Sequence, residues 1–365
     1  MLRDLPILRY DSALDDFIQL RQRTFYPKTD LELPLAELNA IREERDREAP
    51  ALAGALLQSL RFEGRRPTSI QPLSSGTFHL LFRADFGPNT IAYVRTGYTF
   101  RQRPAFEFVI ELSISELLPS TKVPGAEVLC NDLTRVEFPL DYQLIREAPG
   151  HPLNKIENPD TQFIPDAILE DWGRTLARVH QINATGAGLL NPRALEHGRC
   201  EGVLSSWNDY LLLNLDKHLD LCVAAGAVPS KVLPSISKTI FDSIPRLGNV
   251  PIRLLQGDPG HHNIFAAGEK ISAIIDWEDA LAGDPIFDVA YWGTFVRDYM
   301  REPFLRGYRE ISPLSPDFEF RYWLYYLRVA ISKTAHRHLF AYKDRPGRPP
   351  PSERISKALS YLTTL

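Results

Sequence analysis

The apolar residues of this chain follow two patterns, one typical of helices and one typical of short strands. Between Asp166 and Asn183 they recur every three or four positions, at Ile168, Leu169, Trp172, Leu176 and Val179. This spacing predicts an amphipathic helix with one buried face. Helices are also predicted over residues 11–20, 35–47, 49–62, 105–118, 206–224 and 318–339, and apolar runs bounded by turn residues predict strands at 69–73, 79–86, 90–96, 140–145 and 271–275.

The order of these elements indicates an α+β chain in three parts. Residues 1–66 form a helical N-terminal extension, the strands gather in residues 67–150, and residues 151–365 are mainly helical. With 365 residues, the chain is long enough for more than one domain. We expect the extension to pack against the strand-rich part, with its charged run 43–48 as a solvated helix face. A dimer contact is the alternative, so the oligomeric state stays open.

Composition narrows the function classes. Hydrophobic residues make up 44% and charged residues 24%, as in ordinary globular proteins, and the net charge is −4. The basic residues form no dominant cluster, so we expect no nucleic-acid partner. No apolar stretch reaches the roughly 18 residues of a membrane span, so we expect no membrane partner. The three cysteines match no zinc or disulfide framework, and no charged, apolar leader opens the chain, so a cytoplasmic protein with reduced thiols is predicted.

The segment 254–288 carries the clearest chemistry. Asp258 and Asn263 lie five positions apart in GDPGHHN, and Asp276 follows thirteen residues later, at the end of a predicted hairpin strand. A loop carboxylate, a loop amide and a strand-end carboxylate can therefore converge. Carboxylate and amide oxygens are ligands that Mg²⁺ prefers, and a further carboxylate can orient an attacking hydroxyl, as phosphoryl transfer requires. Each residue alone could instead cap a turn, but the combination with the following WEDA and GDP sequences favours function.

These motifs, G-D-x-x-x-x-N followed by I-I-D-W-E-D-A-x-x-G-D-P, resemble the aminoglycoside phosphotransferase and choline kinase family. The resemblance implies a protein-kinase-like fold, with a small antiparallel-sheet N-lobe that ends in a hinge near residue 150 and a larger helical C-lobe. It implies that Asp258 is the catalytic base and that Asn263 and Asp276 bind Mg²⁺. Gln256 stands where the family usually has a histidine before Gly-Asp. The glycine two residues after the aspartate, Gly260, resembles the sequence variant of hygromycin phosphotransferases.

The predicted N-lobe contains candidate nucleotide contacts. Ser75, Gly76 and Thr77 form a small-residue turn between two strands, where backbone N–H groups could approach phosphates. The same turn could be an ordinary hairpin. By motif order, Arg95 and Glu111 match the basic residue and the helix glutamate that this family uses to hold the phosphates. The usual basic residue is Lys, and Arg retains its charge.

Three further points concern the nucleotide and the supporting residues. Glu107, one turn before Glu111 on the same helix face, is the alternative partner of Arg95. In the resembled fold, Arg146 and Ala148 lie at the hinge that reads the adenine, and the sequence does not choose ATP over GTP. Asp284 is predicted to cap a helix that begins at Pro285, and with Asp288 to brace the catalytic loop, while His180 is expected to be structural.

The acceptor is less clearly marked. Residues 276–319 contain ten acids and four arginines, which could form an acidic wall that attracts a cationic substrate; we favour solvated or capping roles. The resemblance implies a small hydroxyl-bearing substrate, with an aminoglycoside or related antibiotic as the leading class and choline, homoserine or other metabolites as rivals. A non-catalytic nucleotide-binding pseudokinase is the other alternative, because of Arg95 and Gln256. A protein kinase is disfavoured, because Trp-Glu-Asp follows Asp276 and no A-P-E segment is present.

Overall fold

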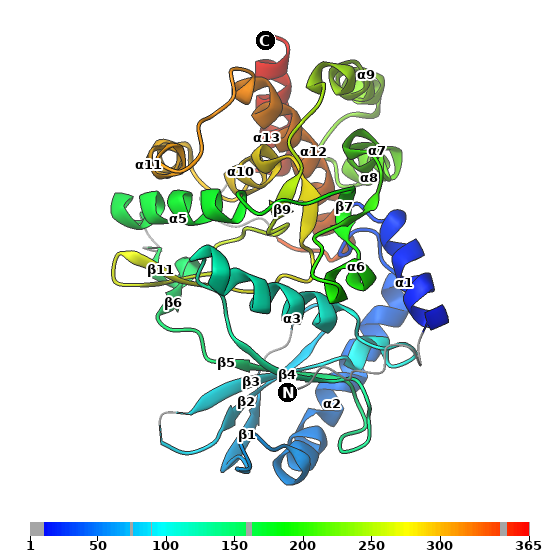
Figure 1. Ribbon diagram of the computed structural model, residues 1–365. Helices are drawn as coiled ribbons and strands as arrows, with labels where there is room; N and C mark the ends of the chain where they lie inside the picture. Colours follow the sequence, from blue (N-terminus) through cyan, green and yellow to red (C-terminus); the bar gives the residue numbers. More distant parts are fainter. Residues whose placement is uncertain (1–10, 74–75, 89, 158–162, 344–348, 365) are drawn as a thin grey trace.

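The chain forms two lobes joined near residue 150, and Figure 1 shows the strand-rich lobe below the helical lobe. The structure, a computed structural model, describes residues 11–73, 76–88, 90–157, 163–343 and 349–364. The smaller lobe is built on a five-stranded antiparallel sheet in the order β1-β2-β3-β5-β4. Its strands are β1 (Ser69–Pro72), β2 (Leu80–Asp85), β3 (Ile91–Thr96), β4 (Val128–Asp132) and β5 (Tyr142–Arg146).

This sheet buries one face through the alternation of its side chains. Phe82 and Ala84 of β2, Val94 of β3 and Leu144 of β5 are buried together with Leu56 of the N-terminal region. Helix α3 (Glu107–Leu117) lies between this sheet and the helical lobe (Figure 1). The four strands predicted in this lobe and the helix predicted over residues 105–118 are therefore confirmed, with ends that differ by at most two residues.

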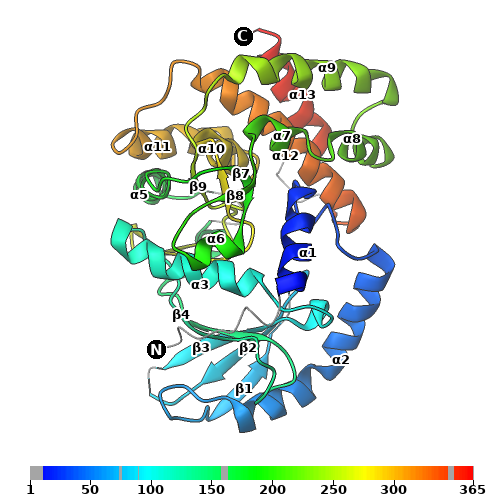
Figure 2. The same cartoon turned by 45° about the vertical axis from the view of Figure 1, so that its right-hand side comes forward.

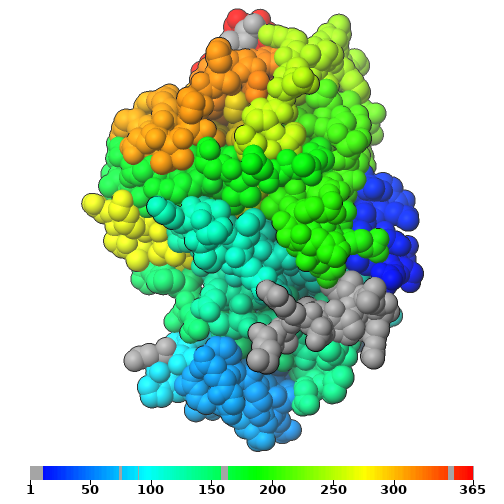
Figure 3. Space-filling view, in the orientation of Figure 1, coloured from blue at the N-terminus to red at the C-terminus, as the bar shows by residue number. Residues whose placement is uncertain are grey.

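The N-terminal extension divides between the two lobes. Helix α2 (Leu35–Ser59) packs on β1 and β2 as predicted, whereas α1 (Asp11–Gln22) contacts strands β7 and β8 of the helical lobe. Leu14 and Phe17 of α1 belong to the core of that lobe, and Figures 2 and 3 show α1 against it. Helix α1 also contacts the smaller lobe, because the ring of Phe17 lies 5.5 Å from that of Phe106. The expectation that the extension packs against this lobe is therefore confirmed, and the packing of α1 on the helical lobe was not predicted.

Helix α2 confirms one prediction and corrects another. The segments 35–47 and 49–62, both predicted as helical, form one helix that runs through Pro50. The proline lies on the exposed side, and the neighbouring Ala49 and Ala53 are buried against the sheet, so packing offsets the lost hydrogen bond. The charged run 43–48 is not a uniformly solvated face, because Arg45 is 1% exposed.

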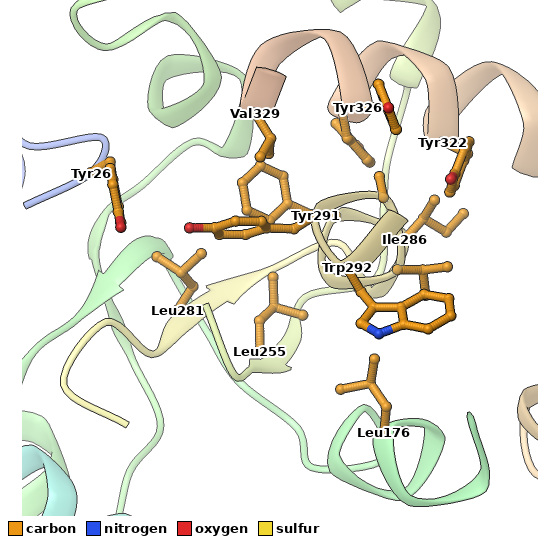
Figure 4. Packing of buried hydrophobic residues seen from close by; sticks show 14 of the residues in the cluster. Tyr26, Leu176, Leu255, Leu281, Ile286, Tyr291, Trp292, Tyr322, Tyr326 and Val329 are labelled. Carbon is orange, nitrogen blue, oxygen red and sulfur yellow. The ribbon is translucent and has the colours of Figure 1, made fainter. Parts of the chain in front are cut away.

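The helical lobe is organised around α12 (Phe318–Leu339). This helix is apolar on most sides, and α8, α10 and α13 pack against it, which is the arrangement expected of a helix without a polar face. Figure 4 shows its Tyr322, Tyr326 and Val329 above α10. The other helices are α4 (Leu153–Ile156), α5 (Asp166–Val179), α6 (Pro192–Glu196), α7 (Trp207–Leu212), α8 (Leu215–Ala224), α9 (Leu233–Ser243), α10 (Pro285–Gly293), α11 (Asp298–Arg309) and α13 (Pro351–Leu362).

The amphipathic pattern of α5 is confirmed, because all five of its predicted apolar residues are buried. Its close crossing with α11 depends on Gly173, where an added Cβ would lie 2.0 Å from the carbonyl oxygen of Phe304. The predicted helix 206–224 is instead divided into α7 and α8 at Asn214, whose φ is 54°. Helix α13 was not among the predicted helices; it begins at Pro351, where a proline is well tolerated because its missing N–H would have no partner within the helix.

The segment 254–288 contributes strands to two small antiparallel sheets. One has the order β11-β10-β6 and the other β8-β7-β12-β9. Their strands are β6 (His151–Pro152), β7 (Ala187–Leu190), β8 (Gly202–Leu204), β9 (Arg253–Leu255), β10 (Ile264–Ala267), β11 (Lys270–Ile274) and β12 (Leu281–Gly283). Strands β10 and β11 form the predicted hairpin, with Gly268 at φ 61° in its turn.

The three cysteines are free, as expected. Among the described residues, none of the helices combines the length and the apolar character that crossing a bilayer requires.

Candidate active site

The loop between β9 and β10 holds Asp258 in a fixed, buried position. Asp258 is 3% exposed. The preceding Gly257 has φ 84°, and a Cβ there would lie 2.0 Å from the carbonyl oxygen of Asp279, so only glycine allows the two loops to approach this closely. Asp288 of α10 accepts hydrogen bonds from the backbone N–H groups of Gln256 (2.6 Å) and Gly257 (3.1 Å).

The predicted cap at Asp284, the contact of Asp288 with the loop and the structural role of His180 are confirmed. The predicted bracing of the loop by Asp284 is not confirmed, because its side chain contacts Arg321 and Tyr325 instead. Asp284 caps α10 by accepting a hydrogen bond from the backbone N–H of Ile286 at 3.1 Å. His180 lies 3.3 Å from Asp288 and 2.8 Å from the Tyr308 hydroxyl. This network fixes the start of the catalytic loop from beneath.

Gln256, which replaces the histidine usual in the resembled family, makes hydrogen bonds that hold the loops of Asp258 and Asp276. Its side-chain amide donates to the carbonyl oxygens of Ile275 (3.2 Å) and Asp276 (3.1 Å), and its side-chain oxygen accepts from the backbone N–H of Asp258 (2.7 Å). One glutamine therefore ties the loop of Asp258 to the loop of Asp276. The replacement of histidine preserves a bridge between the two motifs.

Asn263 and Asp276 are brought to the same cavity as Asp258. The side-chain N–H₂ of Asn263 donates to the backbone carbonyl of Asp258 at 3.0 Å, which leaves the amide oxygen as its remaining polar atom. Asp276 has φ 63°, a left-handed conformation that is costly for a residue with a Cβ. One amide oxygen and one carboxylate fit Mg²⁺, which takes few protein ligands and completes its shell with water and phosphate oxygens.

Arg95 lies at the centre of a buried ion cluster. Its guanidinium contacts Glu111 at 2.6 Å, Glu278 at 2.7 Å and Asp276 at 3.3 Å. Burial alone would lower the pKa of Arg95, but Glu111 and Glu278 raise it above its usual range. The predicted contact with Glu111 is present, and the alternative partner Glu107 pairs with Arg103 instead.

Glu278 and His79 were not among the predicted site residues. His79 lies 2.8 Å from Glu278, and its other ring nitrogen lies 3.2 Å from the carbonyl oxygen of Thr96. Burial raises the pKa of Glu278, but His79 and Arg95 outweigh it, so this pKa lies well below its usual range. The Trp-Glu-Asp sequence after Asp276 was a signal for Glu278, whereas nothing in the sequence marked His79.

Nine of the ten predicted site residues line one cavity of about 1160 Å³ between the lobes: Gly76, Thr77, Arg95, Glu111, Arg146, Ala148, Asp258, Asn263 and Asp276. The tenth, Ser75, lies outside the described residues. The guanidinium of Arg146 pairs with Glu127 at 2.6 Å. The cavity is larger than an ordinary single-ligand pocket, so it has room for a nucleotide and a second small molecule.

Two lysines that the sequence did not indicate flank Asp258. Lys28, from the connection between α1 and α2, lies 3.2 Å from one carboxylate oxygen of Asp258, and Lys333 of α12 lies 3.3 Å from the other. Burial raises the pKa of Asp258, but the charges of Lys333 and Lys28 outweigh this effect and hold the pKa far below its usual value. Asp258 is therefore ionised at neutral pH.

The acids of residues 276–319 form no acidic wall. Each contacts a basic side chain: Asp276 and Glu278 meet Arg95, Asp279 meets Lys28, Asp284 and Asp317 meet Arg321, Asp288 meets His180, Asp298 meets Lys357, Glu302 meets Arg309, Glu310 meets Arg174, and Glu319 meets Arg301. Of the ten, Asp276 and Glu278 line the cavity. The acid excess in the sequence therefore serves ion pairs and does not mark a cation-binding surface. The solvated or capping roles that we favoured hold for exposed acids such as Asp298 and for Asp284, which caps α10. They do not hold for the buried Glu278, Asp279 and Asp288.

Comparison with known proteins relates this site to a family. A model described as the phosphotransferase enzyme family (APH) matches residues 93–323. The chain is 22% identical over 237 residues to hygromycin-B 4-O-kinase from Escherichia coli, and the match covers 63% of this chain and 64% of that protein, so it spans less than two thirds of the relative's length.

Solved structures show the same fold at low sequence identity. A thermostable mutant of aminoglycoside phosphotransferase APH(4)-Ia, in ternary complex with AMP-PNP and hygromycin B, has a TM-score of 0.57 at 18% identity, covering 82% of this chain and 93% of that one. A choline/ethanolamine kinase family protein from Mesorhizobium loti has a TM-score of 0.54 at 16% identity, covering 87% and 94%. The family match extends over more than half of the chain and includes the loops of Asp258 and Asp276, so this protein belongs to the phosphotransferase enzyme family and has its kinase-like α+β fold.

Proposed function

We propose that this protein is an ATP-dependent kinase that transfers the γ-phosphate to a hydroxyl group of a small molecule. The observation that carries this proposal is the convergence of Asp258, Asn263, Asp276 and Arg95 on one cavity large enough for two ligands. Phosphoryl transfer needs positioning and charge neutralisation more than covalent chemistry, and these side chains are suited to both tasks.

Asp258 acts on the acceptor. Its ionised carboxylate accepts a hydrogen bond from the attacking hydroxyl and takes the proton as the new P–O bond forms, while the bond between the γ-phosphorus and the bridging oxygen breaks and ADP leaves. The low pKa of Asp258 makes it a weak base, which is sufficient when the transition state is loose and proton transfer is late. Orientation of the hydroxyl is therefore its main contribution.

The nucleotide is held by residues of both lobes. Arg95, fixed by Glu111, contacts phosphate oxygens, and Asn263 and Asp276 provide the ligands for Mg²⁺, which neutralises phosphate charge when bound. Gly76 and Thr77 lie along the phosphates, and Ala148 lies at the hinge beside the base. ATP is the proposed donor, with GTP as the alternative.

The acceptor classes begin with aminoglycosides, because the relative in Escherichia coli is named as a hygromycin-B kinase. Choline, homoserine and other metabolites follow, because a choline/ethanolamine kinase family protein has the same fold. A pseudokinase is less well supported, since Gln256 bridges the two catalytic loops and Arg95 retains its glutamate partner. We propose a cytoplasmic location, and the oligomeric state is open.

The test is an acceptor panel incubated with purified protein and Mg-ATP, with phosphorylated product detected by mass. Product with any hydroxyl acceptor supports the proposal, and a parallel series with GTP identifies the donor. Detection of product is essential, because release of ADP alone could be hydrolysis. Nucleotide-dependent thermal stabilisation without product across the whole panel would favour the pseudokinase.

A further inference from the structure

The half of the cavity that faces away from the nucleotide lobe is basic and aromatic. It is lined by Tyr26 and Lys28 of the N-terminal extension, by Phe295, and by Lys333 and His336 of α12. Arg337 and Arg354 also line the cavity from α12 and α13. The two lysines are mostly buried, with side chains 14% and 13% exposed, so their charges are poorly screened by water.

Few acids line the cavity among the residues that the structure describes. The acids that line the cavity are Glu111, Glu147, Asp258, Asp276 and Glu278. Three of them belong to the cluster of Arg95, and Glu147 accepts a hydrogen bond from the Tyr93 hydroxyl near the hinge. In the part of the chain that the structure describes, Asp258 is thus the one lining acid on the acceptor side.

The two lysines are held in place by their surroundings. The ammonium group of Lys333 donates to the Tyr26 hydroxyl at 2.8 Å and lies 4.2 Å from the ring centre of Tyr26, 4.7 Å from Tyr291 and 5.2 Å from Phe295. Figure 4 shows the hydroxyl groups of Tyr26 and Tyr291 directed toward one another. Such an aromatic cage stabilises a cation, so Lys333 is a fixed charge rather than a mobile surface lysine.

Lys28 is equally constrained. Its loop is anchored by Asp30, which accepts hydrogen bonds from the backbone N–H groups of Phe25 (2.9 Å) and Tyr26 (3.2 Å) and lies 2.9 Å from a ring nitrogen of His218. Lys28 then contacts Asp279 at 3.4 Å as well as Asp258. Burial raises the pKa of Asp279 above its usual value, and the charge of Lys28 opposes this shift.

Any acceptor must come close to both lysines. Its reacting hydroxyl has to donate a hydrogen bond to Asp258, and each oxygen of that carboxylate already lies within 3.3 Å of an ammonium group. The hydroxyl oxygen is therefore at most about 6 Å from the nearer ammonium. A polycationic acceptor would meet two like charges there, and an anionic group would meet two opposite charges.

We propose that the acceptor carries an anionic group, a carboxylate or a phosphate ester, close to the reacting hydroxyl, and that Lys28 and Lys333 bind this group. The inference rests on the proposed kinase function, and it places anionic acceptors ahead of aminoglycosides as the acceptor class. Lys28 and Lys333 are then specificity-determining residues. Lys28 is supplied by a region that precedes the family match at residues 93–323.

The experiment uses acceptor pairs that differ in charge, with the full-length protein and Mg-ATP. The pairs are glycerate and glycerol, gluconate and glucose, and glucose 6-phosphate and glucose; kanamycin, hygromycin B and choline form the cationic arm. We expect kcat/KM for the anionic members to exceed that for their neutral partners by about tenfold or more, because a charge-assisted hydrogen bond is lost in the latter. The carboxylate and phosphate arms then distinguish the two anions.

The lysine variants separate acceptor binding from a role in phosphate transfer. Lys28→Met and Lys333→Met should each raise KM for the anionic acceptor about tenfold and leave KM for ATP within about twofold. Lys28→Arg and Lys333→Arg should restore part of the affinity, and Lys238→Met, on the exposed side of α9, is the matched control. Equal losses for every acceptor would overturn the proposal in favour of contacts to the transferred phosphate.

Binding measurements cover the case in which no acceptor is turned over. Calorimetric titration of the same panel into the protein with a non-hydrolysable ATP analogue should show tighter binding of the anions, lost in both methionine variants. Equal binding of charged and neutral partners, or fastest turnover of an aminoglycoside, would overturn the inference while leaving the kinase proposal intact. Absence of nucleotide binding would contradict the kinase proposal itself.

Discussion

Two regions of this protein reach the same cavity by different routes. In the segment 254–288, Asp258 and Asn263 lie in the loop before the β10–β11 hairpin, and Asp276 lies in the loop after it. All three residues line the cavity. The N-terminal extension places Lys28 beside Asp258 across 230 positions of sequence. The first region can be recognised from local spacing, whereas the contribution of the second depends entirely on how the chain folds. We infer that the residues of the segment 254–288 carry out phosphoryl transfer, and that Lys28 of the N-terminal extension contributes to the choice of acceptor.

The extension also supports the site at other points. Arg21 of α1 donates to the backbone carbonyl of Glu278 at 3.4 Å, and Arg45 of α2 donates to the carbonyl oxygens of Gly76 and His79 at 3.3 Å. Thus α1 contacts the loop after Asp276, and α2 contacts the proposed phosphate turn. The extension therefore bridges the two lobes at the cavity that they form.

The largest expected effect belongs to the catalytic segment. Asp258→Ala should lower kcat by about 100-fold or more, because the acceptor hydroxyl loses the group that orients it. Nucleotide binding, measured by thermal shift with Mg-ATP, should persist, because Asp258 acts on the acceptor. Asp258→Asn is the second variant, since asparagine removes the charge but keeps the size of the side chain and an oxygen that can accept hydrogen bonds from the two ammonium groups. Near-normal kcat in both variants would remove Asp258 from the mechanism.

A different defect is expected at the metal ligands of the same segment. Asp276→Asn should raise the Mg²⁺ concentration for half-maximal activity by about tenfold, because a hard anionic ligand becomes neutral. Asn263→Ala should act in the same direction with a smaller shift. The measurement is a Mg²⁺ titration at fixed ATP, with Asp258→Asn as the comparison variant. An unchanged titration for Asp276→Asn would contradict its assignment.

The Arg95 cluster tests whether two predicted residues act as one unit. Arg95→Ala should raise KM for ATP by about tenfold and lower kcat, and Arg95→Lys should keep part of the activity because the charge survives without the forked geometry. Glu111→Gln should give a smaller defect of the same kind. The double variant should be less than additive. Strictly additive losses would place Arg95 outside the phosphate site and strengthen the pseudokinase alternative.

Features that depend on local sequence patterns could be predicted, whereas contacts between distant parts of the chain could not. The β10–β11 hairpin, α3, α5 and α12 were predicted because each has a periodic apolar pattern that its own burial satisfies. The contact of Arg95 with Glu111 was predicted through the family resemblance. Lys28, Lys333 and His79 could not be predicted, since their neighbours in sequence carry no motif and their partners lie far along the chain.

Packing between distant parts of the chain also determines the structure of α2. The helical segments predicted over 35–47 and 49–62 are joined in α2, because packing on the sheet offsets the unfavourable effect of Pro50 inside a helix. The charged run 43–48 was interpreted from composition alone. In the folded chain, the buried guanidinium of Arg45 donates hydrogen bonds to the carbonyl oxygens of Gly76 and His79, which need a donor.

Arg45 provides a test of the extension that does not involve the acceptor. Arg45→Ala removes a buried guanidinium that holds the turn at Gly76, and we expect it to raise KM for ATP about threefold and lower the free energy of unfolding by about 1–3 kcal/mol. The matched control is Arg47→Ala, since Arg47 is exposed on the same helix. Equal effects of the two substitutions on KM for ATP would show that the extension does not support the nucleotide turn.

The last expected effect is a pH dependence carried by Lys333. Burial lowers the pKa of Lys333 to about 8, although Asp258 opposes this shift. The groups that face it are Tyr26 and Lys28 from the extension, Asp258 from the catalytic loop and Tyr291 from α10. Because its folded pKa lies below the unfolded value of 10.5, Lys333 loses its charge as the pH rises through about 8.

KM for an anionic acceptor should therefore rise severalfold between pH 7 and pH 9, while KM for ATP changes less. Lys333→Arg should remove this rise, because a guanidinium stays charged over the whole range. Between pH 8 and the unfolded pKa, the unfolded chain binds the extra proton, so the contribution of Lys333 to stability should increase with pH in that interval. Initial rates in a constant-ionic-strength buffer series, with melting temperatures in the same buffers, measure both effects. A flat KM for the acceptor in the wild type, or the same rise in Lys333→Arg, would show that the charge of Lys333 does not contribute to acceptor binding.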